Sequence, residues 1–429
     1  MNLIGGQLMD DKQARAALGH INEMILNTLS GEPLTAGRVI AACDSLSKKI
    51  GSGAYLPLLL ARGIFPEKAE KELAEAAHML SKEYLEKRLE IEFDDSFGEI
   101  AIFEGGKVRQ MWKPLGTLFH IAAGNMDALP AFSVIEGLLT GNINILKLPG
   151  GDDGLSVEIL RELIKFEPLI ADYVFVFNIP SEDIEAMRAM AGVADAVIVW
   201  GGDAAVSAVR KLAAPDTRII EWGHKISFAY VSGEPSDAEL EGIAENICET
   251  DQLLCSSCQG IFIDTEDYNE VTRFAGRFFE ILQRRSAEMP LPDDPYRTAQ
   301  KTLELYTEEL ESASIQKRVY RGDACNRSAC GVIASPDSAL RSSYQFRNCW
   351  VKPLPENRIL AELLSYKNHL QTVALLCEPE DRGRLEAIFA KTGIVHITDG
   401  KNMSKEYPGL PHDGEFSLRR YMKRLSVKS

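Results

Sequence analysis

The sequence has no long apolar run, no excess of basic residues and no cysteine framework of the kind found in small secreted proteins. No stretch approaches the roughly 18–20 uninterrupted apolar residues of a membrane-spanning helix. The formal net charge of -16 argues against nucleic acids and anionic membranes as partners, because it would repel their phosphates. The eight cysteines are scattered over 429 residues, so we expect reduced thiols and a cytoplasmic location.

The chain is long enough for two or three domains that each bury their own core. Its 45% hydrophobic and 26% charged residues are ordinary for a globular protein. The first part predicts helices at residues 14–29, 36–50 and 66–89, followed by a weakly alternating strand at 93–103. We find no chemistry in this part of the chain.

From residue 114 onward, buried-strand patterns alternate with helical patterns. The predicted strands are 116–123, 144–147, 173–179, 196–200, 218–221 and 226–231. Helices are predicted at 128–140, 155–166 and 182–190, the last capped by Ser181, with a further helix ending near Leu212. This alternation predicts an α/β fold with a parallel, doubly wound sheet, whose ligands bind beyond the carboxyl ends of the strands. A second α/β region follows residue 260.

Polar and glycine residues follow several of these predicted strands. Asn125 could donate to a developing oxyanion, although asparagine after glycine is equally typical of a turn. Lys147 could reach a ribose hydroxyl or a phosphate, or it could simply extend its amine from a strand end to water. Gly201 and Gly202 would let a pyrophosphate approach the backbone of a helix N-terminus. No G-x-G-x-x-G follows the first strand, so the standard dinucleotide fingerprint is missing.

The stretch 251–260 contains two cysteines, two serines and two glutamines between a predicted helix and a predicted strand. Cys255 has small neighbours that permit approach, and its own N–H could serve as an oxyanion donor, so it is a candidate nucleophile. A lone cysteine is more often a buried apolar residue. Cys255 and Cys258 also form a C-x-x-C, which leaves a redox pair or half a zinc site open. No second C-x-x-C or H-x-x-H follows at a usable spacing.

The order of these segments is more specific than any one of them. The segments are 114–125, 138–149, 199–202, 221–225, 251–257 and 412–414. Together they resemble the aldehyde dehydrogenase superfamily and, within it, the acyl-CoA reductase family typified by the fatty-acid reductase of bacterial luminescence systems. The resemblance covers roughly residues 110–425.

The resemblance implies a role for each matching residue. Cys255 would accept the acyl group, and Asn125 with the Cys255 N–H would form the oxyanion hole. Lys147 would bind the adenosine ribose or its phosphate, and Gly201 and Gly202 would face the cofactor.

Three further positions match the family pattern less directly or depart from it. Glu221 matches the residue that activates water in hydrolytic aldehyde dehydrogenases, yet water would discharge the acyl-enzyme of a thioester reductase. His224 stands where the superfamily has a second glycine. His412 belongs to a segment that resembles the C-terminal signature of the reductase branch.

The resemblance implies that an acyl-CoA, or another acyl thioester such as an acyl-protein, is reduced to the aldehyde through an acyl-cysteine. NADPH is favoured over NADH, because Gly150 stands where NAD-preferring relatives carry a glutamate that would repel a 2′-phosphate. Asp152 and Asp153 could restore that repulsion. No metal ion is implied by the residues.

The expected domains are 1–245, with helices and the NAD(P)-binding α/β domain, 246–405, the catalytic domain, and 406–429, which would return to the cofactor domain or an oligomer interface. The resemblance also implies a homo-oligomer and an acyl-transferring partner enzyme. Two alternatives stay open: an aldehyde dehydrogenase or acyl-phosphate reductase of the same superfamily, and a non-catalytic scaffold that keeps the fold.

Overall fold

The structure is a computed structural model that describes residues 1–61, 63–93, 98–101, 107–122, 128–150, 154–291, 295–315, 317–322 and 328–428. The chain forms two compact units. Unit 1 comprises Met1–Ala54, Leu73–Gly223 and Tyr407–Ser429, and unit 2 comprises Tyr55–Glu72 and His224–Glu406. The units divide the chain at Gly223, earlier than the predicted domain boundary at residue 245. The predicted domain boundary stays a prediction, because a compact unit is not necessarily a domain that folds independently.

Unit 1 is built on a seven-stranded sheet with the order β2-β1-β7-β6-β5-β8-β9. The strands from β7 to β9 are parallel, and β1 pairs antiparallel with β7. Their bounds are β1 Asn2–Ile4, β2 Gln7–Met9, β5 Thr117–Ile121, β6 Ile143–Lys147, β7 Val174–Phe177, β8 Ala196–Trp200 and β9 Arg218–Trp222. Every residue of β6 and β7 is buried, which explains why β7 appears as an unbroken apolar run. Strand β6 also buries two polar residues, Asn144 and Lys147. The predicted doubly wound α/β fold is confirmed.

The helices of unit 1 connect and flank these strands. They are α1 Asp11–Gly19, α2 Ile21–Ser30, α3 Ala36–Gly51, α6 Lys82–Phe93, α7 Leu129–Leu139, α8 Leu155–Phe166, the 3-10 helix η2 Pro168–Tyr173, α9 Ile184–Gly192, α10 Asp203–Leu212 and α16 Ser417–Arg420. The single helix predicted at 14–29 is wrong, because His20 ends α1 through its N–H bonds to Ala17 and Leu18. The helix predicted at 66–89 is also two helices, α5 (Pro66–Leu80) and α6, since the Ser81 hydroxyl accepts the N–H of Tyr84 and starts α6.

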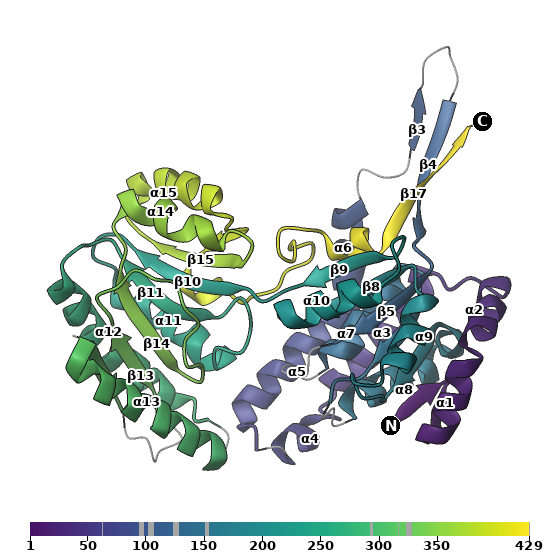
Figure 1. Ribbon diagram of the computed structural model, residues 1–429, viewed down its shortest axis with the longest axis horizontal. Coiled ribbons are helices and arrows are strands. Elements are labelled where there is room, and N and C mark those ends of the chain that lie inside the picture. The colour runs from purple at the N-terminus through teal and green to yellow at the C-terminus, as the bar shows by residue number, and fades with distance from the viewer. Residues whose placement is uncertain are drawn as a thin grey trace. The chain divides into compact units, whose positions relative to one another are not determined.

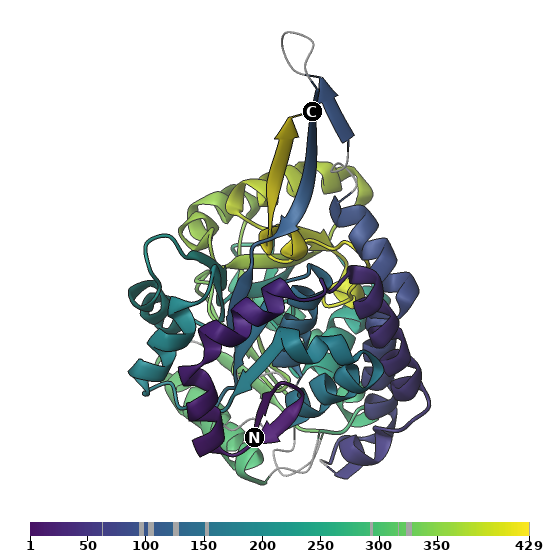
Figure 2. The ribbon, with the colours of Figure 1, turned by 90° about the vertical axis from the view of Figure 1, so that its right-hand side faces the viewer.

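A second sheet of unit 1 consists of three antiparallel strands in the order β17-β4-β3. Their bounds are β3 Gly98–Ala101, β4 Lys107–Pro114 and β17 Met422–Lys428. Figure 2 shows this sheet extending away from the seven-stranded sheet of the same unit. The chain therefore returns to unit 1 at its C-terminal end, where the Asn142 amide bonds the carbonyl of Tyr421 at 3.0 Å.

Unit 2 contains another seven-stranded sheet, in the order β12-β13-β14-β11-β10-β15-β16, with β12 antiparallel to the others. The strands are β10 Ile226–Val231, β11 Cys258–Ile263, β12 Arg318–Arg321, β13 Gly331–Ala334, β14 Asn348–Pro353, β15 Leu370–Leu376 and β16 His396–Thr398. Alternate residues of these strands point to opposite faces. Each face therefore belongs to a different apolar core.

Helices cover both faces of the unit 2 sheet. One core packs α11 (Asp237–Thr250) and α12 (Tyr268–Glu288) against the sheet, and the other packs α14 (Ile359–Leu363) and α15 (Pro379–Thr392) (Figure 1). The remaining elements of this unit are α4 Leu56–Ala61, the start of α5, α13 Pro295–Ile315 and the 3-10 helices η3 Glu356–Arg358, η4 Leu364–Tyr366 and η5 Gly400–Asn402. Across the described ranges, no helix combines the length and apolarity needed to cross a membrane.

Candidate active site

The stretch that contains Cys255 begins where α11 ends. Asp251 and Gln252 both adopt the left-handed backbone conformation, with φ of 47° and 61°. Such a conformation is unfavourable for residues other than glycine and persists only where the surroundings hold it. These two residues turn the chain out of the helix and into the segment that leads to β11. We call residues 251–257 the nucleophile loop.

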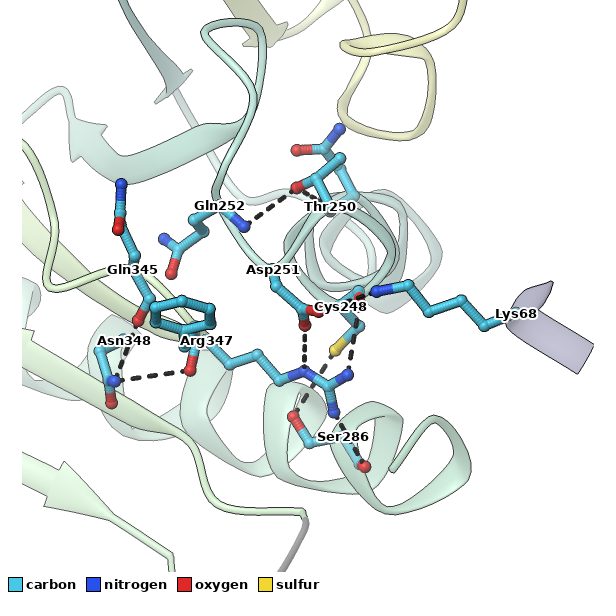
Figure 3. A network of polar contacts seen from close by, with 11 residues as sticks. Lys68, Cys248, Thr250, Asp251, Gln252, Ser286, Gln345, Arg347 and Asn348 are labelled. Carbon is cyan, nitrogen blue, oxygen red and sulfur yellow. Dashed lines mark hydrogen bonds and ion pairs between the residues drawn. The ribbon is translucent and has the colours of Figure 1, made fainter. Parts of the chain in front are cut away.

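The first residue of the nucleophile loop is held by two cations. Arg347 Nε lies 3.1 Å from Asp251 Oδ1, and Lys68 Nζ lies 2.8 Å from Asp251 Oδ2 (Figure 3). Arg347 is only 1% exposed, and its other nitrogens donate to the carbonyl oxygens of Ser286 and Cys248 at 3.2 and 3.3 Å. Each buried charge therefore has partners, which compensates for its lost hydration.

Hydrogen bonds within the loop and to residues on either side of it fix its course. The N–H of Leu254 donates to Ser257 Oγ at 3.1 Å, and the N–H of Ser257 donates back to the carbonyl of Leu254 at 3.1 Å. The Gln252 amide donates to the carbonyl of Cys258 at 2.9 Å, and Asn246 Oδ1 accepts the N–H of Cys258 at 2.9 Å. The polar residues that distinguish this stretch in the sequence therefore brace it.

Cys255 lies half-buried within this loop. Its carbonyl oxygen accepts a hydrogen bond from Ser227 Oγ at 2.7 Å. Its sulfur accepts one from the side-chain amide of Gln371, with Nε2 at 3.3 Å from Sγ. Ser227 and Gln371 both contact Cys255, and the sequence alone does not reveal either contact, since neither residue lies in a motif. The predicted nucleophile thus has a fixed backbone and a donor at its sulfur.

Cys258, the other cysteine of the C-x-x-C, has a different environment. It is 0% exposed, and its thiol donates to the carbonyl of Gly260 at 3.3 Å. Burial raises the pKa of Cys258 to about 12. A thiol that ionises so poorly is a weak nucleophile near neutral pH. Of the two cysteines, Cys255 is therefore the better candidate.

The C-x-x-C of Cys255 and Cys258 also leaves a redox disulfide and a zinc site as alternatives. Among the described cysteines no disulfide is formed. Over the same part of the chain, no group of three or more histidine, cysteine, aspartate or glutamate side chains could hold a metal ion together.

Lys147 ends strand β6 of unit 1, where the sequence places it. Its side chain is almost enclosed, since the residue is 4% exposed, and Nζ donates to Ser181 Oγ at 2.7 Å. Burial lowers the pKa of Lys147, and the nearby Glu182 partly opposes this. The predicted helix cap Ser181 is wrong, because α9 begins at Ile184 and the Asp183 carboxylate accepts the N–H of Ala186 at 3.1 Å. The Ser181 hydroxyl is instead the partner of the lysine.

The residues around Lys147 are partly outside the described ranges. Gly150 is exposed, and a Cβ there would meet no atom within 4 Å. Asn125, Asp152 and Asp153 lie outside the described residues, so their predicted roles stay predictions.

Gly201 and Gly202 follow the end of β8, as predicted. The N–H of Gly201 bonds the carbonyl of Trp222 at 3.1 Å, and Gly202 is the N-cap of α10. A Cβ at Gly202 would meet no atom within 4 Å, so the space beside this helix N-terminus is open. Backbone N–H groups at such a place suit a phosphate, although Asp203 also puts a carboxylate in the first turn.

A chain of buried hydrogen bonds holds the strand before this turn. Trp200 Nε1 donates to Ser133 Oγ at 3.1 Å, and Ser133 Oγ lies 2.7 Å from His120 Nδ1. His120 Nε2 lies 3.0 Å from Asn144 Oδ1, so that nitrogen carries the proton. Burial lowers the pKa of His120 to about 4, which keeps its ring neutral. Four elements, α7, β5, β6 and β8, are linked in this way.

His412 packs against two tryptophans in unit 1. Its ring centroid lies 4.7 Å from that of Trp222 and 5.4 Å from that of Trp200, both edge to face. Glu221, one residue before Trp222, forms an ion pair with Arg210, whose Nη2 lies 2.6 Å from Glu221 Oε1. This pairing occupies the carboxylate that the resemblance assigns as a base. The catalytic roles of Glu221 and His412 stay predictions.

The fold defines the class of protein. The chain has the aldehyde dehydrogenase fold, as comparison with solved structures indicates. Against betaine aldehyde dehydrogenase of Staphylococcus aureus, the TM-score is 0.72 at 14% identity, over 100% of this chain and 92% of that one. Against a lactaldehyde dehydrogenase, the TM-score is 0.69 at 15% identity, over 100% and 95%.

The family is narrower than the fold. The model of the family described as acyl-CoA reductase (LuxC) matches residues 56–424, so the chain belongs to this family. The long-chain acyl-protein thioester reductase of Aliivibrio fischeri is 25% identical over 323 residues, which are 73% of this chain and 64% of that protein. Long-chain acyl-protein thioester reductase 2 of Photobacterium leiognathi is 23% identical over 323 residues, again 73% of this chain and 64% of that protein. This chain therefore spans less than two thirds of the length of these relatives.

Proposed function

We propose that this protein reduces an acyl thioester, either an acyl-CoA or an acyl-protein, to the aldehyde through a covalent acyl-Cys255 intermediate. The observation that carries the proposal is the environment of Cys255: half-buried, braced through its carbonyl and hydrogen-bonded at sulfur. The names of the matched relatives support a thioester as substrate.

In the first step the Cys255 thiolate attacks the carbonyl carbon of the substrate thioester. A new carbon–sulfur bond forms, the tetrahedral species collapses, and the substrate's own thiolate leaves with the electrons of the broken bond. The Cys255 N–H and the Asn125 amide would hold the oxyanion, an interaction worth about 2.7–4 kcal/mol per donor in comparable sites. The braced loop keeps the N–H and the sulfur in fixed positions relative to one another.

A nicotinamide cofactor would supply the hydride that reduces the acyl group. The residues of unit 1 fit such a cofactor: Lys147 is an enclosed cation whose hydroxyl partner a ribose oxygen or phosphate could replace, and the space beside Gly202 is open. After reduction, the carbon–sulfur bond to Cys255 breaks, the aldehyde leaves, and the thiolate is restored. We assign Glu221 no step in this cycle, because water activated by a base would discharge the acyl-enzyme; its carboxylate forms an ion pair with Arg210.

NADPH is the proposed donor rather than NADH, supported by Gly150, which is exposed and offers no carboxylate to a 2′-phosphate. We also propose a cytoplasmic homo-oligomer, with a catalytic domain from residue 246 and an acyl-transferring enzyme as partner. Family resemblance supports these last proposals.

The test is acylation of the full chain by a labelled acyl-CoA. In Cys255→Ala we expect labelling to be abolished while NADPH binding, followed by fluorescence, is retained. Cys258→Ala is the matched control and should label normally. Full labelling of Cys255→Ala would overturn the proposal, and release of inorganic phosphate from an acyl phosphate with no reaction of acyl-CoA would favour the acyl-phosphate reductase alternative.

A further inference from the structure

Resting on the proposed function, we infer that Gln371 is a further catalytic residue, whose side-chain amide donates to the Cys255 sulfur and stabilises the thiolate. The inference deepens the role of Cys255, because it names the group that prepares the sulfur for attack. Gln371 belongs to β15, whereas Cys255 belongs to the nucleophile loop, so the two meet only through the fold.

The contact is built into the sheet. Strand β10 pairs in parallel with both β11 and β15, and both pairings are irregular around Ser227. There the Ser227 hydroxyl replaces part of the backbone ladder: it donates to the carbonyl of Cys255 at 2.7 Å and accepts the N–H of Thr372 at 3.0 Å. One hydroxyl therefore joins the backbone of Cys255 to the residue that follows Gln371.

This connection fixes the distance between donor and sulfur. Gln371 Nε2 lies 3.3 Å from Cys255 Sγ, within the range of a hydrogen bond to sulfur. Gln371 is 7% exposed, and burying an amide costs free energy that an apolar side chain of the same size would not. A methionine would fill the same volume without that cost. The hydrogen bond from the amide to Cys255 Sγ offsets part of that cost.

The effect of the Gln371 amide depends on whether the Cys255 sulfur is a thiolate, a thiol or a thioester. A thiolate is a stronger acceptor than a thiol or a thioester sulfur, so the amide favours the ionised form. An amide removes no proton, so the thiol proton leaves to solvent. The same hydrogen bond helps twice: it raises the thiolate population before attack, and it stabilises the thiolate that departs when the carbon–sulfur bond breaks.

The test compares Gln371→Met with the wild-type enzyme, and uses Gln300→Met, on the exposed side of α13 in the same unit, as the matched control. The rate of iodoacetamide alkylation at Cys255, read from its peptide by mass spectrometry, is followed against pH. We expect the pH midpoint of alkylation in Gln371→Met to rise by about one unit. With acyl-CoA at neutral pH, kcat should fall about tenfold with KM within about twofold. Gln300→Met should match the wild-type enzyme.

A second variant covers a failure of Gln371→Met to fold. Gln371→Glu keeps the shape of the side chain but places a carboxylate beside the sulfur, so alkylation at neutral pH should slow further. An unchanged midpoint and unchanged kcat in a folded Gln371 variant would overturn the inference. That result leaves the proposed function intact as long as Cys255→Ala abolishes acylation, so the two failures are distinguishable.

Discussion

The nucleophile loop of unit 2 and the edge of the unit 1 sheet where β6 ends at Lys147 hold their polar groups in different ways. Asp251, at the start of the loop, has a cation at each carboxylate oxygen, and both the backbone and the sulfur of Cys255 are hydrogen-bonded. Lys147, at the edge, donates to the hydroxyl of Ser181 and is otherwise held by burial. Each arrangement suits a different task.

Under the proposed function, the nucleophile loop is the part that is held in place before its ligand binds. A nucleophile must meet a carbonyl carbon at a defined distance and angle, so a rigid loop lowers the barrier. A cofactor-binding lysine needs a partner that it can exchange, because the ligand's oxygen must take the place of the serine hydroxyl. We therefore expect substitutions that loosen the loop to cost stability and turnover, and substitutions at the edge to cost cofactor affinity.

The largest effect is expected from the cation that anchors the loop. Arg347→Met leaves the buried Asp251 carboxylate with one of its two cations, and removing one partner of a buried ion pair typically costs about 3–5 kcal/mol. Urea unfolding at pH 7 measures the loss. Arg284→Met breaks an exposed pair with Glu241 and is the control, with an expected loss under about 1 kcal/mol. Equal losses in the two variants would show that the network does not anchor the loop.

A somewhat smaller effect is expected at the buried histidine that supports the edge. The folded pKa of His120 is about 4, below the ordinary 6.5, so the unfolded chain takes up a proton first as the pH falls. Stability from this group is therefore full above pH 6.5 and is lost progressively down to about pH 4, by about 3 kcal/mol in total.

His120→Gln removes the titrating ring and should flatten that part of the pH dependence. Urea unfolding at pH 7 and at pH 4.5, for the wild-type protein and the variant, gives the comparison. The same acid-induced loss in both proteins would contradict the assignment of a neutral, buried His120.

The smallest effect is expected at Lys147 itself. Lys147→Met should raise KM for NADPH about tenfold, or about 1.4 kcal/mol, while acylation of Cys255 by acyl-CoA stays unchanged. Steady-state kinetics with NADPH and with NADH shows whether the lysine meets the 2′-phosphate, because only the NADPH reaction should then suffer. A loss of acylation with unchanged KM would reverse the contrast between the two sites.

Much of the fold could be predicted from the sequence because the buried strands and helices carry strong periodic signals. The strand predicted at 196–200 is β8 (Ala196–Trp200), and the helix predicted at 155–166 is α8 (Leu155–Phe166). The breaks at His20 and Ser81 could not be predicted from periodicity, because the apolar spacing continues across both. They depend on local hydrogen bonds that end one helix and start the next.

The candidate site likewise contains residues with a local sequence signal and residues that only the fold brings in. Cys255, Lys147, Gly201 and Gly202 could be proposed as site residues from the sequence because they lie in motifs or at strand ends. Gln371 and Arg347 could not, since each acts on the loop from a distant part of the chain and has no local signature. The residues around Ser181 predict a helix cap, whereas its contact with Lys147 depends on the packing of β6 against the loop before α9.

The central claim is that Cys255 receives the acyl group. It is tested most directly by mixing the wild-type enzyme with an acyl-CoA in the absence of a reductant and mapping the adduct by mass spectrometry of its peptides. We predict one acyl group per active site, on the peptide that contains Cys255 and sensitive to hydroxylamine, as a thioester is. An adduct on Cys258 or another cysteine, with Cys255 unmodified, would contradict the account.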